Sequence, residues 1–134
     1  MTQDIRWKQR FQHFNSALDW LAKAVNRNDL DMIGQAGAIQ FFEMCFELSW
    51  KLLKDYLEHE GYSDVASPRS AIKQAFNAGL ISNGHEWMEV LNDRNMTSHV
   101  YDEETARNIY QLISSKYYPM FVELQNTFSR LDHE

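Results

Sequence analysis

The sequence predicts an all-α protein, an up-and-down antiparallel bundle of about five helices in one domain spanning residues 1–134. Apolar side chains recur at spacings of three and four residues through most of the chain, which is the period of a half-buried helix. No segment alternates convincingly with a period of two, and no hairpin signal is present. A chain of 134 residues with 44% apolar residues suits one compact domain with a real core.

The first helix is expected over residues 4–26 and the second over residues 30–60. One apolar stripe runs along the first helix. Arg6, Lys8 and Arg10 lie beside this stripe, and we favour a solvated face over an RNA contact for them. The second carries two apolar stripes, which predicts a central helix packed on several neighbours. Its polar seam includes Glu43 and Glu47, one turn apart. Paired carboxylates for a metal or for acid–base chemistry are one interpretation, but an exposed polar stripe is favoured.

Local signals place the remaining helices. Ser67-Pro68 begins a short third helix, since a capping hydroxyl followed by proline is typical of a helix start. A fourth helix is expected over residues 85–95. Asp102 caps a fifth, whose apolar residues continue through Leu112 to residue 131. Pro119 lies inside this pattern and cannot donate a backbone hydrogen bond, so a kink or break is expected near Tyr118.

Composition limits the classes of function. The formal net charge is −6, and non-specific nucleic-acid affinity comes mainly from Lys and Arg on phosphates, so any RNA contact must use a local basic patch. The single cysteine, Cys45, excludes an internal disulfide and a multi-cysteine zinc site. No apolar run approaches the roughly 20 residues of a membrane span, and we expect a cytoplasmic protein with no membrane contact.

The stretch between the fourth and fifth helices concentrates the chemistry. Arginine offers a forked cation suited to phosphate, and histidine can exchange a proton near neutral pH. Arg94 and His99 are five residues apart, which on a continuous helix places them roughly 140° apart around the axis. To share a site they need a helix end between them, for which Thr97 and Ser98 are suited, or a second subunit.

Three interpretations of this stretch compete. In the first, Arg94 and His99 are structural and pair inside the core or at an interface. In the second, His99 acts as general base or acid in metal-independent RNA cleavage, Arg94 stabilises phosphoryl charge, and Asn95 with Thr97 or Ser98 orients the substrate. In the third, the stretch binds a nucleotide or a partner enzyme. One arginine and one histidine are few for phosphodiester cleavage, so catalysis predicts a twofold dimer with a composite site.

Four blocks of the sequence resemble HEPN-domain proteins of the HepT type, a family also called nucleotidyltransferase substrate-binding proteins. One block, Arg94-x-x-x-x-His99-x-Tyr101, matches the family motif R-x-x-x-x-H-x-Y but is a weak signal alone. The others are Phe42-Glu43-x-x-Phe46-Glu47-Leu48-x-Trp50-Lys51, Leu53-Lys54-Asp55-Tyr56-Leu57 and Ser67-Pro68-Arg69. All four blocks in chain order, with these spacings, form a strong signal. The resemblance covers nearly the whole chain, from about Trp7 to Leu124.

The resemblance implies a homodimeric helical bundle that works with a minimal nucleotidyltransferase of the MNT type. In one family role the protein is the ribonuclease toxin of a toxin–antitoxin pair. The catalytic pair then falls on Arg94 and His99, the polar residue after the arginine is Asn95, and Tyr101 is where the partner transfers AMP. Added bulk and negative charge beside His99 would block the RNA phosphate.

The alternative family role is a non-catalytic substrate-binding subunit of a two-component nucleotidyltransferase. A groove lined by aromatic residues such as Trp50, Trp87 and Tyr101 is one place for its substrate, although core packing is favoured for the two tryptophans. The partner would supply ATP and Mg²⁺ chemistry. The sequence has no Gly-rich phosphate loop and no clear carboxylate triad, so we expect no metal site and no cofactor in this chain.

Overall fold

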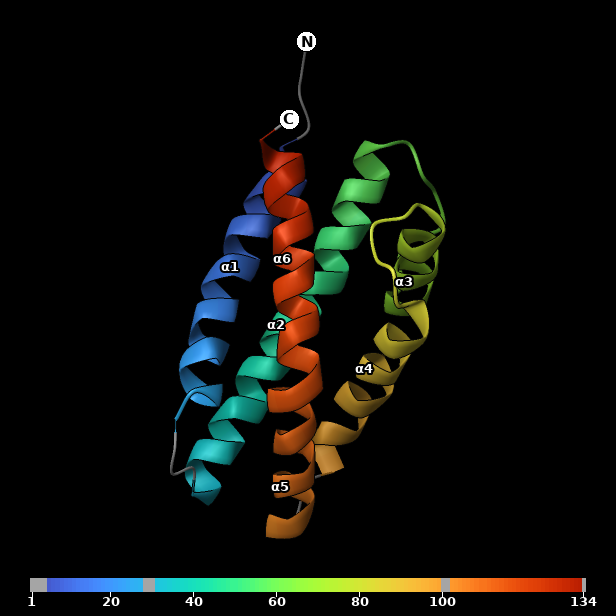
Figure 1. Cartoon of the computed structure of the whole chain (residues 1–134). Helices are drawn as coiled ribbons and strands as arrows, with labels where there is room; N and C mark the ends of the chain where they lie inside the picture. The colour runs from blue at the N-terminus through green and yellow to red at the C-terminus, as the bar shows by residue number, and fades with distance from the viewer. Residues whose placement is uncertain (1–4, 28–30, 100–101, 134) are drawn as a thin grey trace.

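The fold is a helical bundle, and its helices follow the apolar periods of the sequence. The structure is a computed structural model that describes residues 5–27, 31–99 and 102–133, with His99 described by its backbone alone. Four helices are followed by a longer helical rod in three parts, as Figure 1 shows. The elements are α1 (Arg6–Val25), α2 (Met32–His59), α3 (Pro68–Asn77), α4 (Gly84–Met96), the 3₁₀ turn η1 (Thr97–His99), α5 (Glu103–Leu112), the π-helical segment η2 (Ile113–Tyr117) and α6 (Tyr118–Asp132).

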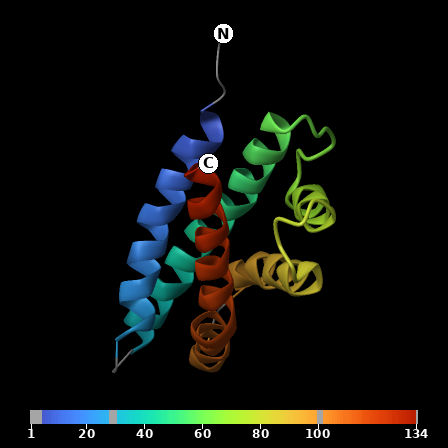
Figure 2. The same ribbon diagram turned by 45° about the horizontal axis from the view of Figure 1, so that its top comes forward.

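Three long elements, α1, α2 and the rod from α5 to α6, run antiparallel side by side, and the shorter α3 and α4 lie beyond α2 (Figures 1 and 2). The start of α1 and the end of α6 meet at one end of the bundle, where Lys8 and Asp132 form an ion pair of 3.6 Å. The end of α4 lies at the opposite end. The predicted all-α bundle is confirmed.

The second helix is central, as its two apolar stripes predict. It contacts α1, α3, α4, α5 and α6. Its main stripe is fully inside the core and consists of Ile39, Phe42, Phe46, Trp50, Leu53 and Leu57. Leu112, expected in the apolar pattern of the rod, is instead exposed. It lies roughly 120° around the helix from buried Ala106, which places it on the flank of the rod.

Caps fix the helix ends on either side of the α4 region. The Ser67 hydroxyl accepts from the Ser70 backbone N–H at 3.2 Å at the start of α3. Asp102 accepts from the Thr105 N–H at 2.7 Å, as its place before the fifth helix predicts. These backbone and side-chain hydrogen bonds from Thr105 hold the pKa of Asp102 below its usual value. Gly61 ends α2 with a φ of +95°, a conformation that side chains with a Cβ rarely adopt.

Pro119 disturbs the rod as expected, and the disturbance is a π turn rather than a break. The Tyr118 N–H donates to the Ile113 carbonyl, five residues back, so the helix widens just before the proline. Proline itself offers no donor to residue 115. The rod therefore passes the proline without a loop, and the widened turn faces α4 through Lys116 and Tyr117.

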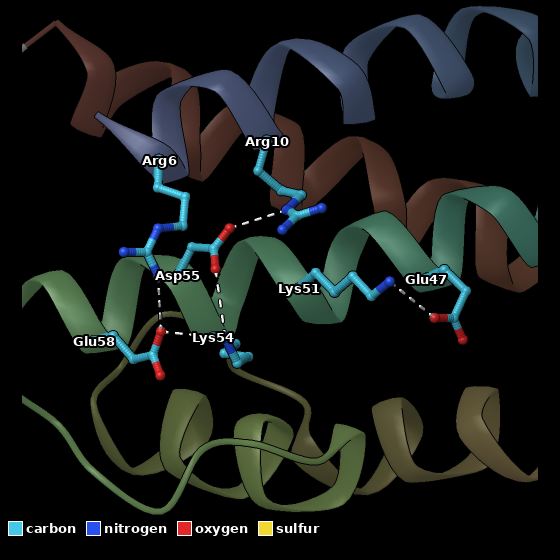
Figure 3. Close-up of polar contacts among 7 residues, drawn as sticks. All are labelled: Arg6, Arg10, Glu47, Lys51, Lys54, Asp55 and Glu58. Atoms are coloured by element: carbon cyan, nitrogen blue, oxygen red, sulfur yellow. Dashed lines mark hydrogen bonds and ion pairs between the residues drawn. The ribbon is translucent and has the colours of Figure 1, made fainter. Parts of the chain in front are cut away.

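Ion pairs join α1 to the far half of α2, as Figure 3 shows. The cations near the start of α1 are not simply solvated. The Arg10 Nε donates to Asp55 at 2.9 Å, and Arg6 lies 3.7 Å from Glu58. Asp55 is only 1% exposed, so this carboxylate is part of the core boundary between the two helices.

Candidate active site

The helix that carries Arg94 ends between Arg94 and His99, as one site shared by these two residues within a subunit would need. The last residue of α4 is Met96, and Thr97–His99 form a 3₁₀ turn. The Thr97 backbone N–H donates to the Arg94 carbonyl oxygen at the helix end, and the Thr97 hydroxyl lies 2.7 Å from the same oxygen. The predicted break between Arg94 and His99 is therefore confirmed.

Glu43 on α2 holds this end of α4. Its carboxylate accepts a hydrogen bond from the Thr97 hydroxyl and lies 3.6 Å from a terminal nitrogen of Arg94. Thr97 is buried by this contact. Residues from two helices that are remote in the sequence thus form one polar cluster, which we call the Glu43 cluster: Glu43, Arg94 and Thr97.

Arg94 keeps unused hydrogen-bonding capacity within this cluster. Its side chain is 29% exposed, and its buried Nε has no hydrogen-bond partner among the residues that the structure describes. A guanidinium has five donor hydrogens in a fixed fork, and the 3.6 Å approach to Glu43 is an ion pair rather than a hydrogen bond. The arginine is therefore oriented by a carboxylate while donors remain for a further acceptor.

The other predicted site residues are placed only in part. Asn95 and Ser98 are exposed, one on the last turn of α4 and the other in the 3₁₀ turn. His99 ends that turn, and its side chain lies outside the described residues, as does Tyr101. The structure brings Arg94 together with Thr97, and it leaves the placement of the His99 and Tyr101 side chains as predictions.

Glu43 and Glu47 do not act as a pair. Glu47 accepts from the Trp50 ring N–H at 3.2 Å and lies 3.8 Å from Lys51, whereas Glu43 turns to α4. The expectation of one exposed polar stripe is correct for Glu47 and wrong for Glu43. The sequence feature that singles out Glu43 is its position inside one of the blocks that carry the family resemblance. That block does not indicate which residue Glu43 contacts.

Two hollows flank the Glu43 cluster on the surface of α2. One, of about 380 Å³, is lined by Met44, Glu47, Leu48 and Arg94 as well as by Gln40 and Glu43. The other hollow, of about 340 Å³, extends toward α5, and Gln40 and Glu43 line both hollows. Its lining is Met32, Ala36, Ile39, Gln40, Glu43, Thr97 and Ala106. Partly exposed methionines line both hollows, so apolar surface surrounds the charged cluster.

A third cavity lies away from this cluster. Its volume is about 400 Å³, and it is lined by the ends of α2, α3 and α6 with a mixture of polar and apolar side chains, including Tyr56, Glu60, Tyr62, Thr127 and Arg130. Neither Trp50 nor Trp87, around which a substrate groove is one expectation, lines this cavity. Both tryptophans are buried in the core, as the favoured interpretation predicts.

Neither a metal-binding cluster nor a membrane-spanning helix is present among the residues that the structure describes. Within residues 5–27, 31–99 and 102–133 no group of three or more His, Cys, Asp or Glu side chains is arranged to hold a metal ion. In the same ranges none of the helices has the length and apolar character needed to span a membrane.

Comparison with known proteins identifies the family. The model of the family described as "Nucleotidyltransferase substrate binding protein like" matches residues 9–130. The chain belongs to this HepT-like family. It is 32% identical to a protein of Thermus thermophilus whose crystal structure superposes with a TM-score of 0.74, covering 88% of this chain and 98% of that one.

A curated relative adds a functional description. Over 82 residues the chain is 37% identical to a Haemophilus influenzae protein described as "Probable ribonuclease HepT". The match covers 58% of this chain and 56% of that protein, so the chain spans just over half the length of this relative. Family membership thus rests on nearly the whole chain, whereas the ribonuclease description comes from a partial match.

Proposed function

We propose that this HepT-like protein is a metal-independent endoribonuclease whose site is built around Arg94 and His99. The observation that carries the proposal is the state of Arg94. Its guanidinium is oriented by Glu43, and its side chain lines a surface hollow and is 29% exposed, so a ligand in the hollow can reach it. A phosphate oxygen is the acceptor that such a fork binds best.

The chemistry follows from the two side chains. His99 of one subunit removes the proton from a ribose 2′-hydroxyl as the 2′-oxygen bonds to phosphorus. The bond from phosphorus to the 5′-oxygen breaks, and a protonated His99 from the second subunit supplies that oxygen with its proton. Arg94 stabilises the charge on the phosphoryl oxygens, and the exposed Asn95 and Ser98 support substrate orientation. The buried Thr97 donates its hydroxyl to Glu43 and so supports the site indirectly.

A homodimer provides the acid and the base together. The supporting observation is the partly exposed apolar surface of Met32 and Met44, which lines the hollows on either side of the Glu43 cluster. Apolar surface beside a charged site suits an interface between copies. In this proposal the composite site is absent from the monomer.

Cleavage of RNA is the direct test. The purified chain is assayed in EDTA with a mixed-sequence RNA, and Arg94→Ala, Arg94→Lys and His99→Asn are compared with wild type. We expect Arg94→Ala to lower the rate by about 100-fold or more, because a donor to transition-state charge is lost. Arg107→Ala is the matched control, since Arg107 is an exposed arginine paired with Glu103 on α5. Equal effects of Arg94→Ala and Arg107→Ala would reject the assignment.

We propose that the partner is a minimal nucleotidyltransferase and that the two form a cytoplasmic toxin–antitoxin pair. In the transfer step the Tyr101 oxygen bonds to the α-phosphorus of ATP, pyrophosphate leaves, and the phenolic proton is released. Intact mass after incubation with the partner, ATP and Mg²⁺ is expected to rise by one AMP in wild type and not in Tyr101→Phe. Tyr62→Phe, at an exposed tyrosine elsewhere, should still gain it. A gain that persists in Tyr101→Phe would move the acceptor to another residue.

The cavity of about 400 Å³ at the ends of α2, α3 and α6 favours a second candidate function. Its size and its mixture of apolar and polar side chains suit a small molecule, as a substrate-binding subunit of a nucleotidyltransferase requires. This function predicts a stable complex with the partner, no RNA cleavage, and no loss of complex activity in His99→Ala. RNA cleavage that depends on Arg94 and His99 would decide against it.

A further inference from the structure

The π-helical segment makes a specific contact with the turn of α4 that carries Arg94. The Tyr117 hydroxyl donates a hydrogen bond to the carboxylate of Asp93, the residue immediately before Arg94. The Tyr117 ring is buried and stacks on Phe42 of α2, with 5.6 Å between ring centroids and 20° between planes. The hydroxyl is therefore presented from a fixed ring and not from a mobile side chain.

A second contact from the same segment holds the preceding turn of α4. The Lys116 ammonium lies 2.8 Å from the Glu89 carboxylate, and Glu89 is one helical turn before Asp93. Two neighbouring residues of η2 thus contact two successive turns of α4. Burial and the hydrogen bond to Asp93 raise the pKa of Tyr117 above its usual value, so the hydroxyl stays a donor throughout the neutral range.

These contacts complement those of Glu43. Adjacent residues on a helix point roughly 100° apart, so Asp93 and Arg94 face different neighbours. Asp93 is held by Tyr117 from the rod, and Arg94 is held by Glu43 from α2. Because the two contacts come from different directions, together they fix the rotation of the last α4 turn about its axis. A contact from one direction alone would leave the turn free to rotate.

We infer that Tyr117 and Asp93 are positioning residues for Arg94, and that the π turn before Pro119 serves to bring the Tyr117 hydroxyl to α4. The kinetic part of this inference rests on the proposed ribonuclease function. Tyr117 and Asp93 act through the helix and touch no substrate in this scheme. Because small misplacements of a catalytic group are costly, loss of the hydroxyl is expected to lower kcat by roughly 10-fold with KM within about twofold.

The test compares Tyr117→Phe with Tyr118→Phe. The first removes only the hydroxyl and keeps the ring that stacks on Phe42. The second removes a hydroxyl from the next residue, a half-buried tyrosine outside the Glu43 cluster and the Asp93 contact. Kinetics on RNA are measured together with the Arg94 Nε–H resonance in a ¹⁵N-labelled sample, assigned by its loss in Arg94→Lys. We expect Tyr117→Phe to shift this resonance and lower kcat, and Tyr118→Phe to do neither.

Variants at Asp93 keep the inference testable if Tyr117→Phe does not fold. Asp93→Asn retains a hydrogen-bond acceptor and should leave the Arg94 resonance closer to wild type than Asp93→Ala does. A lower Tm in Tyr117→Phe with unchanged kcat and an unchanged Arg94 resonance would show a structural role alone and overturn the inference. If wild type does not cleave RNA, the proposed function fails, and the resonance still decides whether Tyr117 and Asp93 position Arg94.

Discussion

At the scale of single residues, the main features are carboxylates that meet partners from distant parts of the chain. Asp55 meets Arg10, 45 positions away, and Glu43 meets Thr97, 54 positions away. Both acids lie on α2. Glu43 belongs to the polar seam of this helix, and Asp55 lies roughly 120° around the axis from it. Helical periodicity gives the face on which a charged residue lies, but its partner depends on which helix packs there. This is why the sequence predicts Arg94 as a site residue and does not predict Glu43 beside it.

Removing the charge of Glu43 is expected to strengthen RNA binding. Glu43→Gln keeps an acceptor for Thr97 but removes a carboxylate 3.6 Å from the Arg94 guanidinium, where it repels a phosphate. We expect a few-fold lower Kd for a non-cleavable 2′-deoxy oligonucleotide, in line with about 0.5–1 kcal/mol for a partly exposed pair. Glu47→Gln changes the net charge equally but lies beside Lys51, and it should have the smaller effect. Equal changes in Kd would indicate net charge alone.

Asp55 is expected to contribute more to stability than its exposed neighbours. Asp55→Ala removes a buried acceptor and leaves the Arg10 guanidinium without its partner. We expect the free energy of unfolding to fall by about 2 kcal/mol, the usual range for a hydrogen bond between charged groups. Glu58→Ala, in the same group of ion pairs in Figure 3, should cost less than about 0.5 kcal/mol because Glu58 is exposed. Chemical denaturation measures both, and a similar loss in the two variants would refute the distinction.

At the scale of elements, most helix boundaries could be predicted because their causes are local. Ser67 and Asp102 cap α3 and α5 through residues three positions later, and the apolar spacing identifies each helix. Pro119 predicts a disturbance near Tyr118 but not its form. Whether a helix kinks, ends or widens there depends on what packs against it, and here the widened turn contacts α4 through two side chains.

The contact between η2 and α4 is expected to weaken at both extremes of pH. Lys116 lowers the pKa of Glu89 from 4.5, so the pair's stabilisation is complete above that value and is lost as pH falls through the lowered pKa. Glu89 raises the pKa of Lys116 from 10.5, so the same stabilisation is present below that value and is lost as pH rises through the raised pKa. A double-mutant cycle of Glu89→Gln and Lys116→Met should show favourable coupling at pH 7 and none in strong acid.

The control for this cycle is the exposed pair Glu103 and Arg107 on α5, which are 4.0 Å apart. Its coupling should be weak at neutral pH because both side chains are largely in water. Coupling of Glu89 to Lys116 that survives in strong acid would show that packing, rather than charge, joins these two residues.

At the scale of the whole molecule, the proposed dimer depends on the surface around the Glu43 cluster. Met44 is 42% exposed and lines the hollow that also contains Arg94. Met44→Glu is expected to shift the protein to monomers and to abolish RNA cleavage, because a buried unpaired charge in an interface is costly. Analytical ultracentrifugation over a range of concentrations measures the shift, with circular dichroism to confirm the fold.

Ile5→Glu is the matched control for this prediction. Ile5 is an exposed apolar residue immediately before α1. The start of α1 lies at the opposite end of the bundle from the last turn of α4 (Figure 1). Ile5→Glu should leave both association and cleavage unchanged. A Met44→Glu protein that stays dimeric and active would place the interface elsewhere on the molecule.

The meeting of the first turn of α1 with the last turn of α6 has a consequence for protein engineering. The Lys8 ammonium and the Asp132 carboxylate form an ion pair, so the two helix ends are within side-chain reach and a linker of several residues can join them. The chain can be reopened in the exposed stretch between α2 and α3. Such a circular permutant keeps α4, η1 and α5 as one uninterrupted segment. The order of the helices along the chain would change, while the arginine at the end of α4 and the carboxylate that orients it would keep their places.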